Sequence, residues 1–165
     1  MKKGNITISN VLTVLRLILS PVIMYYILTS RTYIALLLFV IALSTDVFDG
    51  YLARKRNEVT VLGKILDPLS DKLLYAFVLF GILIKNNLDF WMIFFGVGII
   101  LYVIGYISFV KKKVKITTIG RVMLFLESLV LMAMILGFVN NWILSFFVLL
   151  IIIPLSDYVI KLMRS

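Results

Sequence analysis

Six long apolar stretches, separated by short polar segments, dominate this 165-residue chain. A helix of about 20 residues is long enough to cross the roughly 30 Å hydrocarbon core of a bilayer. The pattern predicts an all-α integral membrane protein, with six transmembrane helices packed into one bundle and a single domain over residues 1–165. The predicted spans are 10–29, 32–52, 65–84, 90–110, 119–139 and 142–163.

The composition excludes a water-soluble globule. Hydrophobic residues make up 62% of the chain and charged residues 15%, whereas soluble domains carry about 45–50% apolar and about 25% charged residues. The chain contains no Cys and no His, which excludes disulfides, thiolate chemistry and the usual zinc sites. Any bound metal is therefore expected to be a hard ion held by oxygen ligands.

Basic residues are distributed unequally between the two sides of the predicted bundle. Arg31 and Lys85 fall on one side, and thirteen basic residues fall on the other. Because cytoplasmic segments of membrane proteins are rich in Lys and Arg, the pattern predicts a multi-pass protein of the cell membrane with both termini in the cytoplasm. This asymmetry also explains most of the formal net charge of +9, so no nucleic-acid partner is expected. The thirteen residues are Lys2, Lys3, Arg54, Lys55, Arg56, Lys64, Lys111, Lys112, Lys113, Lys115, Arg121, Lys161 and Arg164.

Four carboxylates lie at the cytoplasmic ends of the second and third predicted spans. Charged side chains within a membrane are costly, and they are functional candidates by default. Members of each pair are three or four residues apart, so each pair shares one face of its helix. If the two faces meet, the carboxylates repel one another unless cations neutralise them, and oxygen-only ligation indicates Mg²⁺ or Mn²⁺. The four residues are Asp46, Asp49, Asp67 and Asp71.

Small and basic residues lie beside these carboxylates. Gly50 and Ala53 leave room for a helix or a ligand to approach closely. Arg54 and Lys64 suit the oxygens of a phosphate group. Carboxylates, hard metal ions and adjacent cations together are typical of chemistry at a phosphate or pyrophosphate. The alternative is a solvated acidic cluster that pairs with the basic residues 54–56.

The segment from Asp46 to Asp71 carries a recognisable motif. It reads D-V-F-D-G-Y-L-A-R, then eight residues, Gly63, three residues, Asp67, three residues and Asp71. This resembles the motif of the CDP-alcohol phosphatidyltransferase family, D-x2-D-G-x2-A-R-x8-G-x3-D-x3-D, at every fixed position and spacing. The resemblance implies an enzyme of phospholipid biosynthesis that transfers a phosphatidyl or archaetidyl group from a CDP-linked lipid to an alcohol, releasing CMP.

The resemblance also implies roles for the motif residues. It implies two divalent ions, Mg²⁺ or Mn²⁺, in an active site that faces the cytoplasm, and a homodimeric assembly. Asp71 is the implied base that deprotonates the acceptor hydroxyl. The implied metal ligands are Asp46, Asp49, Asp67 and Asp71. The implied CDP-lipid pocket consists of Asp49, Gly50, Ala53, Arg54 and Gly63.

Two further segments bear on the identity of the acceptor alcohol. Residues 9–16, S-N-V-L-T-V-L-R, are similar to P-N-x-L-T-x-x-R of the glycerol-phosphate and cardiolipin-type members, with Ser9 in place of Pro. Residues 62–72, L-G-K-I-L-D-P-L-S-D-K, resemble L-G-K-x-L-D-P-L-A-D-K of the same branch. These likenesses imply glycerol 3-phosphate as the acceptor. Inositol phosphate, serine and phosphatidylglycerol are alternatives, because 90–110 lacks the charged residues that glycerol-phosphate members often carry there.

Four cations are interpreted as ligands of the acceptor phosphate. Lys64 belongs to the motif segment, and Lys115 and Arg121 lie in or beside T-T-I-G-R at 117–121, which is similar to a T/S-x-x-G-K/R element of relatives. Arg16 lies inside the first predicted span and has two open interpretations. It binds a lipid or acceptor phosphate, or it pairs with a carboxylate of the bundle or snorkels to the membrane surface.

Two hypotheses from other classes compete with the enzyme. A small divalent-metal transporter would use the carboxylates to line a pathway, but it predicts carboxylates at mid-membrane in several spans, whereas these gather at one edge. A non-catalytic scaffold would not need every motif position. The predicted partners of the enzyme are a CDP-linked lipid, a small phosphorylated alcohol and the surrounding membrane lipids.

Overall fold

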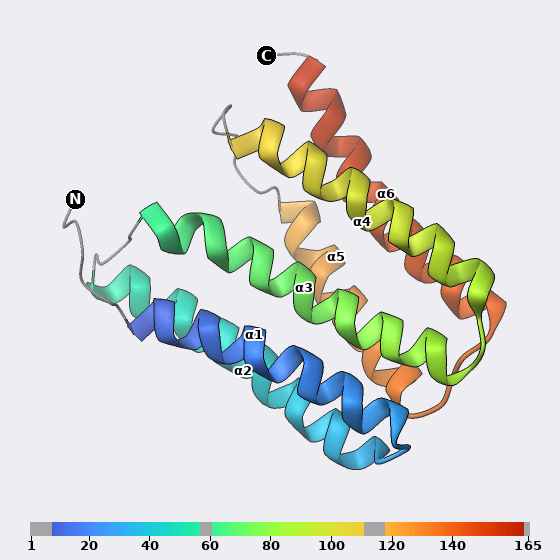
Figure 1. Ribbon diagram of the computed structural model, residues 1–165. Helices are drawn as coiled ribbons and strands as arrows, with labels where there is room; N and C mark the ends of the chain where they lie inside the picture. Colours follow the sequence, from blue (N-terminus) through green and yellow to red (C-terminus); the bar gives the residue numbers. More distant parts are fainter. Residues whose placement is uncertain (1–7, 57–60, 111–117, 164–165) are drawn as a thin grey trace. The chain divides into compact units, whose positions relative to one another are not determined.

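The computed structural model describes the backbone of residues 8–56, 61–110 and 118–163, and the side chains of 13–45, 70–99 and 122–153. Over these ranges the chain forms six α-helices and no β-strand (Figure 1). The all-helical class is therefore confirmed, as is the order of six helices. The helices are α1 Ile8–Leu28, α2 Thr32–Arg56, α3 Val61–Lys85, α4 Asp89–Val110, α5 Thr118–Ile135 and α6 Asn141–Met163.

Membrane crossing is a separate question from helical class. No helix in the part of the chain that the structure describes is long and apolar enough to span a membrane. The six transmembrane spans and the cytoplasmic termini stay predictions.

Three helices end in the same backbone motif. After α1, the amide of Arg31 donates to the carbonyl of Tyr26 at 2.9 Å, and the amide of Ser30 donates to that of Ile27 at 3.1 Å. This pair of bonds is a Schellman motif, which needs a residue with positive φ just after the helix. Ser30 supplies it after α1, Asn87 after α3 and Gly137 after α5, with φ values of 59°, 53° and 104°. The Gly137 motif ends α5 at Ile135, four residues before the predicted boundary at 139.

The connection between α2 and α3 is shorter than predicted. Residues 53–64 were expected to form a loop, but α2 continues to Arg56 and α3 begins at Val61. Four residues therefore join the two helices, and such a link spans at most about 17 Å. Most of the motif segment consequently lies on helical backbone, at the end of α2 and the start of α3.

The chain divides into two compact units, Met1–Val110 and Lys111–Ser165. In the first unit α1 packs against both α2 and α3, and α4 packs against α3. In the second unit α5 packs against α6, with buried Leu131 and Met134 on one helix and Leu144 and Phe147 on the other. The prediction of a single domain stays a prediction.

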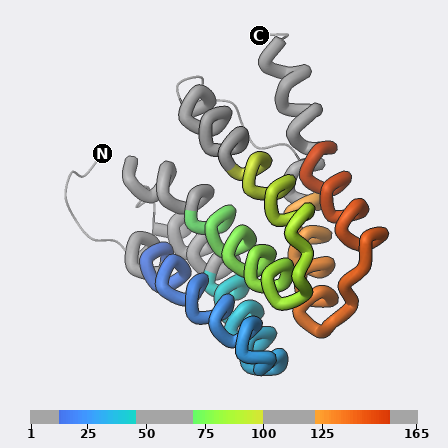
Figure 2. The backbone as a smooth tube through the Cα atoms, turned by 45° about the vertical axis from the view of Figure 1, so that its right-hand side comes forward, coloured from blue at the N-terminus to red at the C-terminus, as the bar shows by residue number. Residues whose placement is uncertain are grey.

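Helices α1 and α3 lie side by side and run in the same direction (Figures 1 and 2). The buried face of α1 changes character along its length. Near its C-terminal end it is apolar, with Ile23 and Ile27 buried. Towards its N-terminal end it is polar, with Thr13, Arg16 and Ser20 buried. The spacing of three or four residues keeps all five on one side of the helix.

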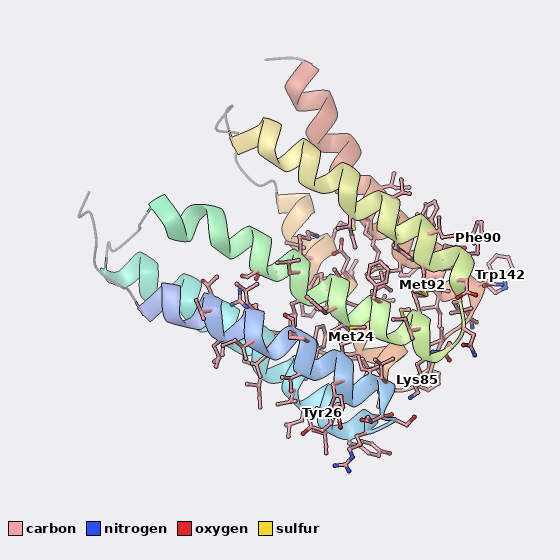
Figure 3. The ribbon with its side chains drawn as sticks, in the orientation of Figure 1. Met24, Tyr26, Lys85, Phe90, Met92 and Trp142 are labelled. Carbon is pink, nitrogen blue, oxygen red and sulfur yellow. The ribbon has the colours of Figure 1, made fainter. Side chains whose placement is uncertain are left out.

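Gly81 fixes the close approach of the apolar halves of α1 and α3. A Cβ atom at this position would lie 3.1 Å from the Cγ of Met24, 3.4 Å from its Cα and 3.5 Å from the Cγ2 of Ile27. Figure 3 shows Met24 between the two helices. A side chain at residue 81 would therefore crowd Met24 and force it to shift, whereas glycine lets the backbones pack closely.

The substitution Gly81→Leu is expected to destabilise the first unit. Overpacking a close contact costs about 1–3 kcal/mol, so the variant should unfold at a lower temperature in thermal denaturation of the purified protein. Gly98→Leu is the matched control, because no atom of the described residues lies within 4 Å of a Cβ built there. Met24→Ala should restore part of the stability lost in Gly81→Leu. Equal destabilisation at both glycines would contradict this account of the contact.

Candidate active site

Arg16 and Asp71 form an ion pair that joins α1 to α3. The Nη1 atom of Arg16 contacts Oδ1 of Asp71 and also donates a hydrogen bond of 3.2 Å to Oγ of Ser70. Of the two interpretations left open for Arg16, pairing with a carboxylate of the bundle is confirmed. Its assignment as a ligand of the acceptor phosphate stays a prediction.

The two charged groups differ in exposure. The side chain of Arg16 is 1% exposed, whereas that of Asp71 is 33% exposed. Burying a charge is costly unless an opposite charge and further hydrogen bonds compensate it. Asp71 and Ser70 provide such contacts for the guanidinium. The carboxylate is thus held from the protein side while part of its side chain remains accessible.

Local helix geometry explains why Arg16 faces this pair. Thr13, Arg16 and Ser20 share the side of α1 that is buried, and all three are at most 1% exposed. The hydroxyl of Ser20 donates to the carbonyl of Arg16 at 2.8 Å. This bond satisfies the buried hydroxyl of Ser20 within its own helix. Ser20 therefore adds to the polar face of α1 through a bond to the backbone of Arg16, not to its guanidinium.

Aromatic residues flank the site on the side of α2. Tyr75, one turn after Asp71, lies with its ring centroid 6.2 Å from that of Phe39 on α2. The Nζ atom of Lys72 lies 5.7 Å from the same tyrosine ring, within the range of a cation–π contact. Lys72, the residue after Asp71, therefore contacts the ring of Tyr75. The contact of Phe39 with the same ring joins α2 to α3.

The other predicted site residues fall outside the part of the chain whose side chains are described. Among the described residues there is no group of three or more Asp, Glu, His or Cys side chains that could hold a metal. Asp71 is the one predicted metal ligand with a described side chain. Those known from the helical backbone alone are Asp46, Asp49, Gly50, Ala53 and Arg54 on α2, Gly63, Lys64 and Asp67 on α3, and Arg121 on α5. Lys115 lies outside the described residues altogether.

Ser70 is a site residue that the sequence reasoning missed. Its side chain is fully buried and accepts the hydrogen bond from Arg16. The signal was present, because serine stands here where the similar branch often has alanine in L-D-P-L-A-D-K. A hydroxyl that replaces a methyl group in a buried helix needs a hydrogen-bond partner, in its own helix or in a neighbouring one.

Removing the charge of Asp71 alone is expected to destabilise the fold, and removing the charge of Arg16 as well is expected to restore part of the lost stability. Asp71→Asn leaves a buried positive charge that is no longer neutralised. Breaking a buried pair in this way costs about 3–5 kcal/mol, and the partial exposure of Asp71 places our expectation near the lower end. The double variant Arg16→Met with Asp71→Asn should unfold at a higher temperature than Asp71→Asn alone.

Thermal unfolding in detergent, followed by circular dichroism, measures these differences. Lys85→Met is the matched control, since Lys85 is an exposed cation at the end of α3 and its loss should leave the unfolding temperature unchanged. Wild-type stability in the Asp71→Asn variant would show that the pair contributes nothing to folding.

Comparison with known proteins places the chain in a family. Residues 6–156 match the family model described as CDP-alcohol phosphatidyltransferase. A protein of Rickettsia felis named CDP-diacylglycerol–glycerol-3-phosphate 3-phosphatidyltransferase is 39% identical over 134 residues, which cover 78% of this chain and 74% of the relative. Its namesake in Rickettsia typhi is 38% identical over 78% of this chain and 75% of its own length. A cardiolipin synthase (CMP-forming)/mitochondrial hydrolase fusion protein of Schizosaccharomyces pombe is 28% identical over 68% of this chain and 19% of its own length. The chain therefore belongs to the CDP-alcohol phosphatidyltransferase family.

Proposed function

We propose that this protein catalyses transfer of the phosphatidyl group of CDP-diacylglycerol to glycerol 3-phosphate, with release of CMP. The observation that carries the proposal is the identity of 37–39% to four relatives that all bear the name of this activity. The complete motif between Asp46 and Asp71 supports the same chemistry, and the family match extends over residues 6–156.

Two divalent ions are proposed for the site, with Asp46, Asp49, Asp67 and Asp71 as their ligands. The donor set fits hard cations, because it consists of carboxylates in a chain without Cys or His. Helical backbone through both pairs keeps each pair on one face of its helix. Bound there, Mg²⁺ or Mn²⁺ would neutralise negative charge on the pyrophosphate and on the departing CMP.

Asp71 is proposed to act as the general base. Its carboxylate is held at Oδ1 by Arg16, while a third of its side chain is exposed, so a hydroxyl group can approach it. In the transfer step the acceptor oxygen forms a bond to the phosphorus that carries diacylglycerol, and the bond from that phosphorus to the CMP oxygen breaks. The hydroxyl proton passes to Asp71.

The donor and acceptor are proposed to bind through different parts of the chain. Asp49, Gly50, Ala53, Arg54 and Gly63 are assigned to the CDP-lipid. Lys64, Lys115 and Arg121 are assigned to the phosphate of the acceptor, since cationic side chains form strong, charge-assisted hydrogen bonds to phosphate oxygens. Arg16 is left out of this set, because its side chain is buried against Asp71.

A location in the cell membrane, with the active site towards the cytoplasm, is part of the proposal. Large apolar side chains are widely exposed on the helices: Tyr33 is 82% exposed, Ile93 71% and Leu37 60%. A bilayer would cover such surfaces, which water-soluble monomers rarely expose over large areas. The excess of basic residues near the proposed active site supports the cytoplasmic orientation. A homodimer is proposed from the family resemblance.

Release of CMP tests the reaction directly. The purified protein, supplied with CDP-diacylglycerol and Mg²⁺ or Mn²⁺, is expected to release CMP at a rate that depends on glycerol 3-phosphate. Chelation by EDTA should abolish the release, and added metal should restore it. Asp67→Asn should lower the rate by at least about 100-fold if the carboxylate holds an ion, because the ion stabilises transition-state charge by several kcal/mol.

An acceptor panel decides the specificity. Inositol phosphate, serine and phosphatidylglycerol replace glycerol 3-phosphate in otherwise identical assays, and product lipids are identified by mass spectrometry. Faster CMP release with any of these would overturn the proposed acceptor. Metal uptake into proteoliposomes without CMP release would instead favour the transporter hypothesis.

The absence of native cysteine allows a clean test of orientation. Lys85→Cys places a thiol on the last residue of α3, just before the turn to α4, and Lys113→Cys places one between α4 and α5. We expect a membrane-impermeant maleimide to label the Lys85→Cys variant in intact cells and the Lys113→Cys variant only after the membrane is opened. The opposite pattern would invert the proposed topology, and labelling of both in intact cells would contradict a cytoplasmic site.

A further inference from the structure

We propose that Arg16 is a positioning residue for Asp71 during phosphatidyl transfer, and that Ser70 assists it. The inference rests on the proposed function, in which Asp71 accepts the proton of the acceptor hydroxyl. The assignment concerns a residue on α1, which lies outside the motif segment at 46–71. It gives α1 a role in orienting the proposed base, beyond its role as a packing partner.

Burial is the first reason for this assignment. The side chain of Arg16 is 1% exposed, so its guanidinium is turned towards the protein and away from solvent. A residue that recruits a soluble phosphate needs exposed donor groups. The donor Nη1 of Arg16 is instead shared between Oδ1 of Asp71 and Oγ of Ser70. Arg16 is therefore placed to orient the carboxylate.

The contact of Arg16 with Oδ1 of Asp71 is the second reason. Arg16 contacts Asp71 at Oδ1, and a third of the Asp71 side chain is exposed. A base must be held within a few tenths of an ångström of its working position, because misplacement of about 1 Å can cost about 100-fold in rate. The ion pair at Oδ1 restricts rotation of the carboxylate, while a third of the Asp71 side chain stays exposed.

The register of α1 against α3 is the third reason. At Gly81 the two helices pack so closely that an added Cβ would lie 3.1–3.5 Å from atoms of Met24 and Ile27, and the helices run in the same direction (Figures 1 and 2). Arg16 lies eight residues before Met24, and Asp71 lies ten residues before Gly81, so about 12–15 Å of helix separates the two contacts. The close packing at Gly81 thus helps to set how far along α1 the guanidinium lies relative to the carboxylate.

Steady-state kinetics of the purified full-length protein separate positioning from phosphate binding. Arg16→Met is expected to lower kcat by about 10- to 100-fold, with KM for glycerol 3-phosphate changed less than about twofold. Arg16→Lys should recover part of the loss, because the observed contact uses one nitrogen and an ammonium group can form it. Ser70→Ala should lower kcat by a few-fold.

Ser20→Ala is the matched control. Ser20 is a buried hydroxyl on the same face of α1 that bonds to its own helix backbone, and its loss should leave both kinetic constants unchanged. A second measurement does not depend on turnover. Modification of Asp71 by a water-soluble carbodiimide, quantified by peptide mass spectrometry, should become faster in Arg16→Met and stay unchanged in Ser20→Ala.

The outcomes decide between distinct explanations. A raised KM for glycerol 3-phosphate at unchanged kcat would overturn positioning and assign Arg16 to the acceptor phosphate. A loss that disappears once rates are corrected for the folded fraction would show a purely structural role. Unchanged carbodiimide reactivity would show that Arg16 does not restrain Asp71. If the wild type releases CMP only with another acceptor, the proposed acceptor fails, and the same variants test positioning with that acceptor. A wild type that releases no CMP with any acceptor overturns both proposals.

Discussion

The ion pair between Arg16 and Asp71 is the interaction on which the arrangement of the first unit depends. A guanidinium that is 1% exposed can be accommodated only where an anion compensates it, so α1 has one rotation and one register in which its polar half fits against α3. The hydrogen bond to Ser70 narrows that choice further. Because Asp71 also closes the family motif, the contact that stabilises the fold and the carboxylate proposed for catalysis are the same group.

Helix α1 organises a site whose motif it does not contain. It packs against both α2 and α3, which carry the two halves of the segment from Asp46 to Asp71. The four-residue link between those helices limits their separation, and α1 holds them from the side. The closeness of Gly81 to Met24 and Ile27 then sets the spacing at the apolar end. The two halves of this face of α1 thus have different roles. The apolar half sets the distance between α1 and α3, and the polar half sets the orientation of Asp71.

Much of this architecture could be read from the sequence, for reasons that are local. Apolar runs bounded by polar breaks predict helices because hydrophobic length and helix length are coupled, and Asn87 follows α3 where the apolar pattern breaks. The extent of α2 and α3 into the basic segment was missed, because Arg and Lys are good helix formers and polarity alone suggested a loop. The early end of α5 was missed because a glycine with positive φ outweighs a continuing apolar pattern.

The partner of Arg16 could not be deduced in the same way. Asp71 is 55 residues away, and helical periodicity assigns a residue to a face without saying which neighbour meets it. From the sequence, any carboxylate of the bundle could be the partner of Arg16, and the register of α1 against α3 selects Asp71. The motif itself could be recognised because all its fixed positions occur in one continuous segment, residues 46–71. Its assignment to metal and CDP-lipid still rests on family resemblance and on the chemistry of the donor set.

The same separation along the chain imposes an order on biosynthesis. At about 5–20 residues per second, the ribosome completes Asp71 roughly 3–11 seconds after Arg16. During that interval α1 already carries its cation, while the carboxylate that will neutralise it has not been made. A lone charge resists burial, so α1 cannot take up its final environment when it is first synthesised. Arg16 can be buried only after α3 has been synthesised. The first unit therefore reaches its final structure when α3 is made, and not when α1 is made.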